Sequence, residues 1–302
     1  MKKLLITGAS GYLGWHCSQQ LPHGWQGIGT FHKHKTGIHA STAAYQVDLT
    51  DKDAVWKMMK EIKPAAVFHL AAVSGTGQCE KAPEETYPIN VEAPTHLAEM
   101  AADLKAKFLF TSSEQVFDGE KGDYAETDQP NPKNKYGEQK LEAEQNIQKI
   151  YPEAVIVRIA VLFGQATPVA QSFLNQWIDT WKKMLTVTAF YDEIRPFMSG
   201  TSCASALFHL VQQGAEGLFH LGGSTAYSRY DFAQLSKEVL ALPFGKIASK
   251  SQQDVEMPAF RPANLSLVCG KIEGTGFTLS NAIDELKKIR PFLQTQPSVS
   301  LN

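Results

Sequence analysis

The stretch Gly8-Ala9-Ser10-Gly11-Tyr12-Leu13-Gly14 decides the fold of this chain. It follows an apolar run at residues 4–8 and precedes a helical pattern, so its glycines lie at a strand-to-helix turn. Glycines at such a turn let the backbone approach a pyrophosphate closely, and the helix N-terminus stabilises the negative charge. The spacing is Gly-x-x-Gly-x-x-Gly. It predicts a dinucleotide-binding βαβ unit at the start of the chain.

Short apolar runs alternate with helical patterns through the first half of the chain, as in a parallel sheet covered by helices. The predicted strands are residues 4–8, 27–31, 44–49, 66–72, 108–113 and 155–161, and the predicted helices include 52–62, 91–104 and 136–150. The strands are apolar on both faces, which indicates burial between two helical layers. We therefore predict an α/β fold of the Rossmann type, with a doubly wound parallel sheet.

The alternation becomes less regular after residue 164. Helices are expected at 169–183, 203–213 and 228–240, strands at 185–191 and 217–221, and Ser280 is the expected N-cap of a last helix that ends near residue 289. This division predicts a dinucleotide-binding domain at 1–164. A smaller α/β substrate lobe follows at 165–302, partly interleaved with the first domain and separated from it by a cleft.

The composition is that of an ordinary globular protein. The chain has 302 residues, 43% of them hydrophobic and 20% charged, and a formal net charge of -2, which gives no electrostatic reason to expect nucleic acid or membrane as a partner. The four cysteines show no Cys-x-x-Cys spacing, so a reducing, cytoplasmic location is expected. The apolar run at the N-terminus is too short for a signal peptide.

The end of the second strand bears on the choice of cofactor. NAD-selective sites usually carry an acidic residue there to hold the ribose 2′-hydroxyl. This chain has His32-Lys33-His34-Lys35 instead, a basic group that suits a 2′-phosphate or is simply a solvated loop. We expect NADP(H) in preference to NAD(H). Asp48, after the third strand, could bind the adenine amino group or could cap a turn.

Tyr136 and Lys140 are four residues apart in a predicted helix and therefore share a face of it. A lysine ammonium beside a tyrosine phenol favours the phenolate and is expected to lower the pKa of the tyrosine. A tyrosine adjusted in this way can exchange a proton with a carbonyl oxygen near neutral pH.

Hydroxyl groups at the end of the fifth predicted strand strengthen this interpretation. In a parallel sheet, ligands bind outside the carboxyl ends of the strands. Ser112 and Ser113 lie at such an end, and strand alternation means that only one of them should face the site. Either hydroxyl could hydrogen-bond to the carbonyl that Tyr136 protonates.

These motifs together resemble the extended short-chain dehydrogenase/reductase superfamily, and within it the dTDP-4-dehydrorhamnose reductase-like branch of sugar-nucleotide reductases. The matching blocks are 8–14, 112–128, 132–144 and 261–267. The resemblance implies that Ser113 is the catalytic serine, that Tyr136 is the acid, and that Lys140 holds the nicotinamide ribose. The cofactor contacts that we expect are Gly8, Ser10, Gly11, Tyr12, Leu13, Gly14, His32, Lys33, Asp48, Leu49, Leu70, Ala71, Ala72, Tyr136 and Lys140.

A nucleotide-sugar is the expected small-molecule partner, and a homodimer is left open. Ser74, Arg195 and Arg261 are the expected substrate contacts, because guanidinium groups suit a pyrophosphate; each arginine could instead pair with a carboxylate such as Glu193 or Glu256. The runs at 71–76, 159–161 and 192–197 depart from the usual pattern of the branch. They leave the identity of the sugar open.

Histidines and aromatic residues elsewhere in the chain do not predict a site. His32, His34 and His39 lack neighbouring carboxylates, so we expect no metal site, and His69 should be a core histidine within the fourth strand. Trp177 and Trp181, with Phe173, follow helical spacing and should form core or a contact between lobes.

Three functions remain open at this point. The first is an NADPH-dependent reductase of a nucleotide-linked 4-keto-deoxysugar. The second is an epimerase or dehydratase of the same superfamily, and the third is a non-catalytic regulatory subunit that retains the fold, as in methionine adenosyltransferase assemblies. Degenerate catalytic residues would favour the third, but Ser113, Tyr136 and Lys140 are all present.

Overall fold

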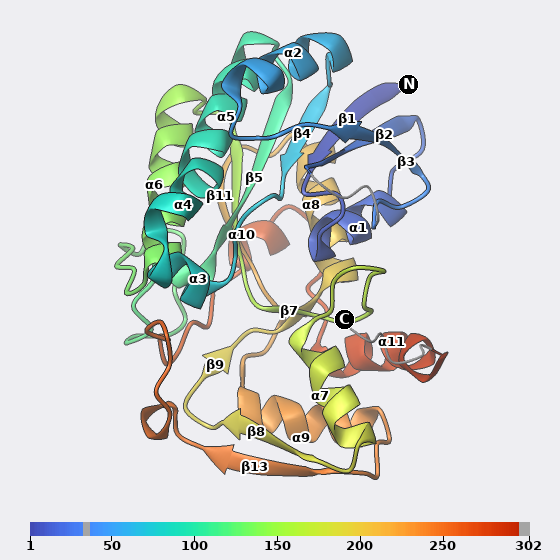
Figure 1. Cartoon of the computed structure of the whole chain (residues 1–302), viewed down its shortest axis with the longest axis vertical. Coiled ribbons are helices and arrows are strands. Elements are labelled where there is room, and N and C mark those ends of the chain that lie inside the picture. Colours follow the sequence, from blue (N-terminus) through green and yellow to red (C-terminus); the bar gives the residue numbers. More distant parts are fainter. Residues whose placement is uncertain (33–36, 296–302) are drawn as a thin grey trace.

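The computed structural model describes residues 1–32 and 37–295, and within them a larger lobe and a smaller lobe stand one above the other (Figure 1). The larger lobe is built on a seven-stranded sheet in the order β11-β6-β5-β4-β1-β2-β3, and every pairing in it is parallel. The strands are β1 Lys2–Thr7, β2 Trp25–Phe31, β3 Thr42–Gln46, β4 Ala66–His69, β5 Lys107–Ser113, β6 Val155–Ile159 and β11 Gly217–Leu221. The predicted Rossmann-type sheet is confirmed.

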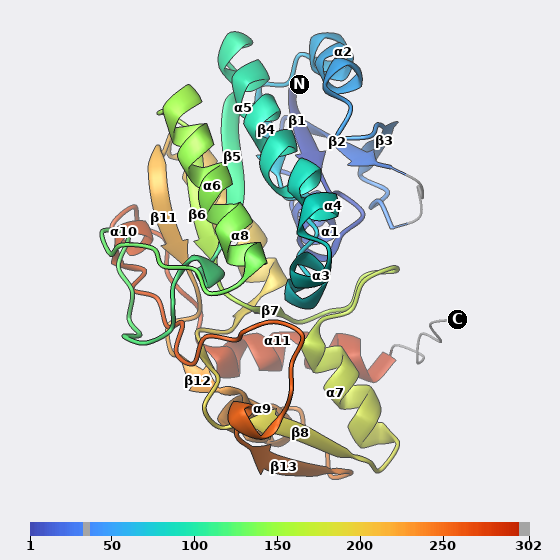
Figure 2. The same cartoon turned by 60° about the vertical axis from the view of Figure 1, so that its left-hand side comes forward.

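Helices cover both faces of this sheet (Figure 2). One layer holds α1 Tyr12–Gln19 and α8 Gly200–Gln212, and the other holds α2 Lys52–Ile62, α5 Ala93–Asp103 and α6 Lys135–Ile150. The two cores meet alternate residues of the same strand: Leu4 and Ile6 of β1 pack against the first layer, while Leu5 packs against the second. This double burial explains why the strands lack a polar face.

Short helices and turns link the longer elements of the chain. They are α3 Thr76–Lys81, α4 Pro83–Tyr87, a π-helical turn Pro88–Glu92, a 3₁₀ turn Glu114–Val116 and α10 Gly270–Glu273. The paired strands β7 Leu162–Phe163 and β10 Met198–Ser199 lie where the two lobes join.

The smaller lobe has a core of its own around the predicted aromatic helix. Its elements are α7 Phe173–Lys182, β8 Thr186–Phe190, β9 Ile194–Arg195, β12 Tyr227–Ser228, α9 Arg229–Val239, β13 Lys246–Lys250 and α11 Ala282–Thr295. Trp181 is fully buried there, and Phe173 stacks edge-on against Trp177 with ring centroids 4.8 Å apart. Trp181 is in the core of the smaller lobe and Phe173 and Trp177 pack against it, which is one of the two expected positions; Phe173 also lines the cavity between the lobes.

The interleaving of the lobes is extensive. The segments that follow residue 164 include α8, which packs on α1, and β11, which pairs with β6 and completes the large sheet. One helix start differs from expectation, because Asn281 rather than Ser280 caps α11: its side-chain oxygen accepts the amide of Asp284 at 2.9 Å. Ser228 caps α9 as predicted, since its hydroxyl accepts the amide of Asp231 at 3.0 Å.

A buried ion pair fixes helix α6 to the sheet. Arg158 of β6 donates hydrogen bonds from Nε and Nη2 to the carboxylate of Glu144 in α6, and the shorter one is 2.7 Å long. Both residues are 3% exposed. A buried pair of this kind contributes little net stability when intact, but the loss of one partner leaves an uncompensated buried charge.

We therefore expect Arg158→Met to lower the free energy of unfolding by about 3–5 kcal/mol, measured by urea denaturation. The double variant Arg158→Met/Glu144→Leu should recover most of this loss, because no charge then remains buried. A double variant no more stable than Arg158→Met would contradict this account of the pair.

Candidate functional site

The candidate site is a cavity of about 520 Å³ between the two lobes. Its lining comes from the carboxyl ends of the sheet strands on one side and from the smaller lobe on the other. The expected site residues that line it are Gly11, Tyr12, Leu13, Leu70, Ala72, Ser74, Ser113, Tyr136, Lys140, Arg195 and Arg261. The structure thus brings together the predicted catalytic and substrate groups and part of the predicted cofactor group. The other described cofactor candidates, Gly8, Ser10, Gly14, His32, Asp48, Leu49 and Ala71, do not line this cavity.

The glycine turn at the start of α1 has the shape that a dinucleotide requires. Gly8 has φ +68°, and a Cβ atom on it would lie 2.9 Å from backbone atoms of Ala71. A Cβ atom on Gly14 would lie 2.2 Å from the carbonyl oxygen of Gly8. No side chain caps the N-terminus of α1 at Gly11, so its amides face the cavity side without a side-chain acceptor. The turn therefore fits a pyrophosphate group.

Thr7, the last residue of β1, holds the segment that follows β4. Its hydroxyl oxygen accepts the amides of Leu70 and Ala71 at 3.2 and 3.3 Å, just after β4 ends. It also meets Nδ1 of His69 at 3.0 Å, and burial lowers the pKa of His69 to about 3. His69 is therefore a neutral core histidine, as expected, and it helps to hold the β1 and β4 ends together.

His32 and Asp48 lie beside each other at the ends of β2 and β3, with Nε2 and Oδ2 3.3 Å apart. Asp48 also accepts the amide and the hydroxyl of Thr50, at 2.9 and 2.7 Å, so it combines turn capping with a position near the expected adenosine. Leu49 is 9% exposed and packs in the core beneath this edge. Lys33 lies outside the described residues, and its predicted role remains a prediction.

Ser113, Tyr136 and Lys140 converge from two elements. Ser113 ends β5, and Tyr136 and Lys140 lie in the first turns of α6, which begins where the Asn134 side chain accepts the amide of Gly137 at 2.9 Å. Ser113 lies near Tyr136 and opposes, in part, the rise in the pKa of the phenol that burial causes. The exposed fractions are 8%, 9% and 2% respectively, so the three groups are shielded from bulk water.

Burial dominates the protonation of this group. Burial raises the pKa of Tyr136, and the smaller effect of the Ser113 hydroxyl lowers it. Burial also lowers the pKa of Lys140 to about 7. The Lys140 ammonium lies 4.0 Å from the centroid of the Phe110 ring. The expectation that Lys140 lowers the pKa of Tyr136 is therefore wrong for the ligand-free protein. Loss of hydration dominates the shift, and Lys140 is not among the groups that affect the pKa of Tyr136.

The structure distinguishes the two candidate serines. Ser112 is 2% exposed, and its hydroxyl has no hydrogen-bond partner within the described ranges. Ser113 accepts the amide of Gln115 at 3.2 Å and also affects the pKa of Tyr136. Both serines contribute to the cavity wall, and the effect on the phenol favours Ser113, in agreement with the choice made from the resemblance.

Arg195 shows the alternative that the sequence left open, since it pairs with carboxylates, Glu193 among them. It is 1% exposed, its Nε lies 3.1 Å from Oε1 of Glu114, and its Nη2 donates to the carbonyl oxygen of Pro262 at 2.8 Å. Its Nη1 donates to the carbonyl oxygens of Ile194 and Ala263 at 2.7 and 3.1 Å. The protein itself thus takes up hydrogen bonds from both Nη atoms, while Nε lies beside Glu114 without a hydrogen bond in the described residues.

Arg229 is a site residue that the sequence did not indicate. It is the first residue of α9, its Nε donates to Glu193 at 2.7 Å, and its guanidinium lies 4.8 Å from the Phe173 ring centroid. Arg261 lies 3.5 Å from the other oxygen of Glu193 and its side chain is 39% exposed. Glu193 and Arg229 are far apart in the chain, so no local motif predicts their pairing.

Glu114 is the second residue that sequence reasoning missed. It follows Ser113, it is 1% exposed, and it reaches the cavity wall beside Arg195. Burial raises the pKa of Glu114 to about 8, although Arg195 opposes the shift. The sequence feature that could have indicated Glu114 is its position directly after Ser113.

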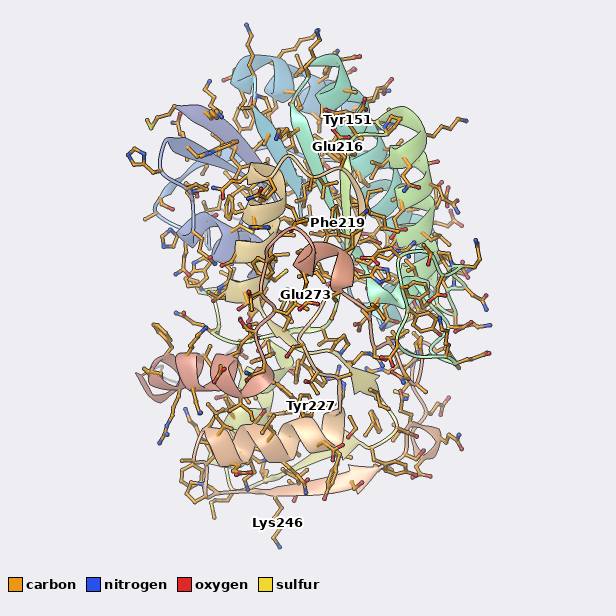
Figure 3. All side chains as sticks on the ribbon, turned by 180° about the vertical axis from the view of Figure 1, so that it is seen from behind. Tyr151, Glu216, Phe219, Tyr227, Lys246 and Glu273 are labelled. Carbon is orange, nitrogen blue, oxygen red and sulfur yellow. The ribbon has the colours of Figure 1, made fainter. Side chains whose placement is uncertain are left out.

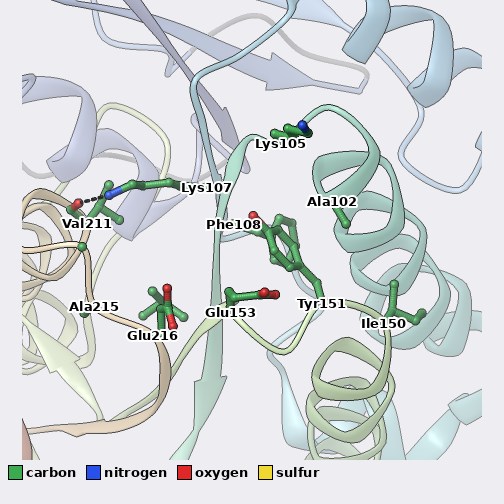
Figure 4. Close-up of a pocket in the computed structure, with 12 residues that line it drawn as sticks. Ala102, Lys105, Lys107, Phe108, Ile150, Tyr151, Glu153, Val211, Ala215 and Glu216 are labelled. Atoms are coloured by element: carbon green, nitrogen blue, oxygen red, sulfur yellow. Dashed lines mark hydrogen bonds between the residues drawn. The ribbon is translucent and has the colours of Figure 1, made fainter.

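A further cavity of about 480 Å³ lies at the opposite, amino-terminal end of the strands (Figure 4). Tyr151 and Glu216 mark this end of the molecule in Figure 3, far from Lys246 of the smaller lobe. Lys107 lies in the wall of this second cavity and donates a hydrogen bond to the carbonyl oxygen of Val211 at 3.0 Å. It holds none of the expected site residues.

No group of three or more potential metal ligands occurs in the part of the chain that the structure describes. A search of the same residues finds no helix with the length and apolar character to cross a membrane.

Comparison with known proteins supports the family. The profile of the RmlD substrate binding domain matches residues 1–290. A probable low-salt glycan biosynthesis reductase, Agl14 of Haloferax volcanii, is 30% identical over 273 residues, which cover 89% of this chain and 90% of that protein. Methionine adenosyltransferase 2 subunit beta of Bos taurus is 28% identical over 283 residues, which cover 91% and 83%.

Solved structures agree with this result. A dTDP-4-dehydrorhamnose reductase of Clostridium acetobutylicum superposes with a TM-score of 0.84 at 28% identity, covering 97% of this chain and 99% of that one. A reductase of Bacillus anthracis in complex with NADP gives 0.85 at 22% identity, with 98% and 100% covered. A UDP-glucose 4-epimerase of Thermus thermophilus in complex with NAD gives 0.83 at 17%, with 98% and 100% covered. The last two show the shared fold alone.

The family profile covers nearly the whole chain, and the cleft holds the serine, tyrosine and lysine that the superfamily uses. The chain therefore belongs to the RmlD substrate-binding-domain family, the dTDP-4-dehydrorhamnose reductase-like branch of the extended short-chain dehydrogenase/reductase superfamily, and is of the oxidoreductase type.

Proposed function

We propose that this protein is an NADPH-dependent reductase of a nucleotide-linked 4-keto-deoxysugar. One observation carries the proposal: Ser113, Tyr136 and Lys140 line the same cleft as the α1 glycine turn on one side and Arg229 and Arg261 on the other. This arrangement offers a place for a dinucleotide, a group that donates a proton to a carbonyl, and a cationic place for the substrate's diphosphate.

The chain's own residues divide the chemistry among them. Tyr136 gives its phenolic proton to the carbonyl oxygen, and the Ser113 hydroxyl donates a hydrogen bond that orients the same oxygen. Burial keeps Tyr136 protonated before the reaction, as an acid must be. A protonated Lys140 binds the nicotinamide ribose and stabilises the phenolate that is left. The nicotinamide cofactor, when bound in this cradle, supplies the hydride.

The charges in the smaller lobe suit a diphosphate. Three arginines, Arg195, Arg229 and Arg261, surround the single carboxylate of Glu193. Burial alone would raise the pKa of Glu193, but Arg229 and Arg195 outweigh this effect and lower it, so Glu193 is ionised. Because Glu114 is largely neutral at pH 7, the group keeps an excess of positive charge. Arg229 and Arg261 are the members with exposed surface.

The preference for NADPH rests on the sequence after β2. The described residue there, His32, is exposed at the edge of the cofactor cradle, and Lys33 and Lys35 follow it in the sequence. These groups suit the additional phosphate of NADPH. Relatives of this fold are in complex with NADP in one case and NAD in another, so the fold itself accommodates either cofactor.

A regulatory role is the second candidate, because subunits beta of methionine adenosyltransferase 2 resemble the chain over 91% of its length. A panel of dTDP-, UDP-, GDP- and CDP-linked 4-keto sugars, followed by NADPH oxidation, separates the two candidates. We expect turnover with at least one of them. The absence of turnover with all four, in protein shown to bind NADPH, would favour the regulatory role.

Replacement of the proton donor tests the chemistry. We expect Tyr136→Phe to bind NADPH normally and to lose about 10²–10⁴-fold in turnover, because general acid catalysis is lost and little else changes. Tyr151→Phe is the matched control, since it also removes one phenolic hydroxyl but lies at the second cavity. A near wild-type rate for Tyr136→Phe would assign the proton to another group.

Titration with both reduced cofactors, followed by fluorescence, tests the cofactor preference. NADPH should bind more tightly than NADH, and Lys33→Ala should weaken NADPH binding about tenfold or more, since a charged hydrogen bond contributes roughly 1.5–3 kcal/mol. NADH binding should not change. Lys246→Ala, at the far end of the smaller lobe (Figure 3), serves as the control. Equal or tighter binding of NADH by the wild-type protein would refute the preference.

The burial of Lys140 should cost stability in the ligand-free protein. Its folded pKa is lowered from 10.5 to about 7, so the unfolded chain binds the proton more tightly and wild-type stability rises with pH between these values. Lys140→Met should therefore raise the free energy of unfolding by about 2–5 kcal/mol at pH 7. The gain should shrink as the pH approaches 10.

Urea denaturation at pH 7 and pH 10 provides this measurement, with Lys107→Met as an exposed control. The same variant should lose cofactor affinity, which separates the functional need for Lys140 from its structural cost. A variant that is equally destabilised at both pH values would show that burial of the ammonium carries no such cost.

A further inference from the structure

Arg195 joins three segments that are far apart in the chain. Its Nε approaches Glu114, which follows the catalytic Ser113, while its Nη atoms donate to the carbonyl oxygens of Pro262 and Ala263, which follow Arg261. Arg195 itself lies in β9, where it is paired with β12. One buried side chain thus contacts both the catalytic end and the anion-binding end of the cleft.

Backbone hydrogen bonds complete the same connection. The amide of Ile194 donates to Ala263 at 2.7 Å, and the amide of Leu265 donates back to Ile194 at 3.1 Å. The amide of Asn264 donates to Gly119 at 3.0 Å, so the segment that carries Arg261 also touches the turn that follows β5. The 261–267 segment therefore depends on β9 for its position.

The ion pairs extend the arrangement to the second anion-binding arginine. Nη2 of Arg195 lies 3.7 Å from Oε1 of Glu193, and the same oxygen accepts Nε of Arg229 at 2.7 Å. Removal of Arg195 would leave the buried carboxylate of Glu193 with less compensation. The segment that carries Arg261 would also lose the side chain that links it to Glu114 and Ser113.

We propose that Arg195 is a positioning residue, which sets the distance between the carbonyl-binding group Ser113 and the diphosphate-binding arginines Arg229 and Arg261. This inference rests on the proposed function and refines it. A planar guanidinium is needed because its fork holds two successive carbonyl oxygens and a carboxyl group at once, which a lysine ammonium cannot do. At 1% exposure, Arg195 acts through these neighbours and does not touch the diphosphate.

Hydrogen exchange tests the positioning without any substrate. In Arg195→Met and in Arg195→Lys, the amides of 261–267 should exchange at least tenfold faster than in the wild-type protein. Lys52→Met is the control, because it removes an ion-paired cation at the start of α2, away from this segment, and should leave exchange at 261–267 unchanged. Unchanged exchange in both Arg195 variants would overturn the proposal, whatever the enzyme's substrate.

Calorimetric titration of the NADPH-loaded protein with dTDP and with UDP tests the consequence. We expect Arg195→Met and Arg195→Lys each to weaken the better-bound diphosphate about tenfold or more, with NADPH affinity unchanged. Adding Arg195→Met to Arg261→Ala should cost little more than Arg261→Ala alone, since both act through one group. The double variant could instead lose affinity by the product of the two single-variant losses, or Arg195→Lys could keep the wild-type affinity. Either result would mean that Arg195 binds the phosphate directly.

The two experiments separate the possible failures. If the wild-type protein binds neither diphosphate and reduces no sugar nucleotide, the proposed function fails, while the exchange rates at 261–267 still decide whether Arg195 positions that segment. Faster exchange together with weaker diphosphate binding supports both.

Discussion

Parallel strands end at a common edge, and this constraint places almost everything that the cleft contains. The glycine turn follows β1, His32 follows β2, Leu70 follows β4, and Ser113 ends β5. The sheet is buried on both faces, so its register is fixed by two independent hydrophobic cores. Groups that are far apart in the sequence therefore meet within one cavity, and helix α6 needs only to place Tyr136 beside Ser113.

Burial of polar groups is the second theme of the structure. The cleft removes Tyr136, Lys140 and Glu114 from water, and burial shifts the pKa of each in the direction that favours its neutral form. This is costly for the ligand-free protein, and it is useful in a site that must bind anions and transfer a proton. The buried pair of Arg158 and Glu144 places the helix, and Glu144, one turn after Lys140, also favours the charged form of that lysine.

The sequence predicted the sheet and the residues of the catalytic group because both rest on local patterns. The spacing of Tyr136 and Lys140 and the glycine turn each lie within a few residues of chain. It offered Glu193 as an alternative partner of Arg195 and Arg261 but did not indicate Arg229, since Glu193 meets Arg229 only after separate segments have folded. The same limitation explains why the pKa of Tyr136 is shifted in the direction opposite to the expected one: burial is not visible in the spacing of two residues.

The central claim is that hydride passes to the carbonyl carbon of a nucleotide-linked 4-keto sugar in this cleft. Deuterium transfer tests it most directly: the protein is incubated with NADPH deuterated at C4 of the nicotinamide and with the best substrate of the panel, and the sugar is examined by NMR. The account predicts one deuterium at C4 of the product sugar for each NADPH oxidised, and almost none with Tyr136→Phe. Oxidation of NADPH without deuterium at that carbon, or a changed sugar without net oxidation of NADPH, would contradict it.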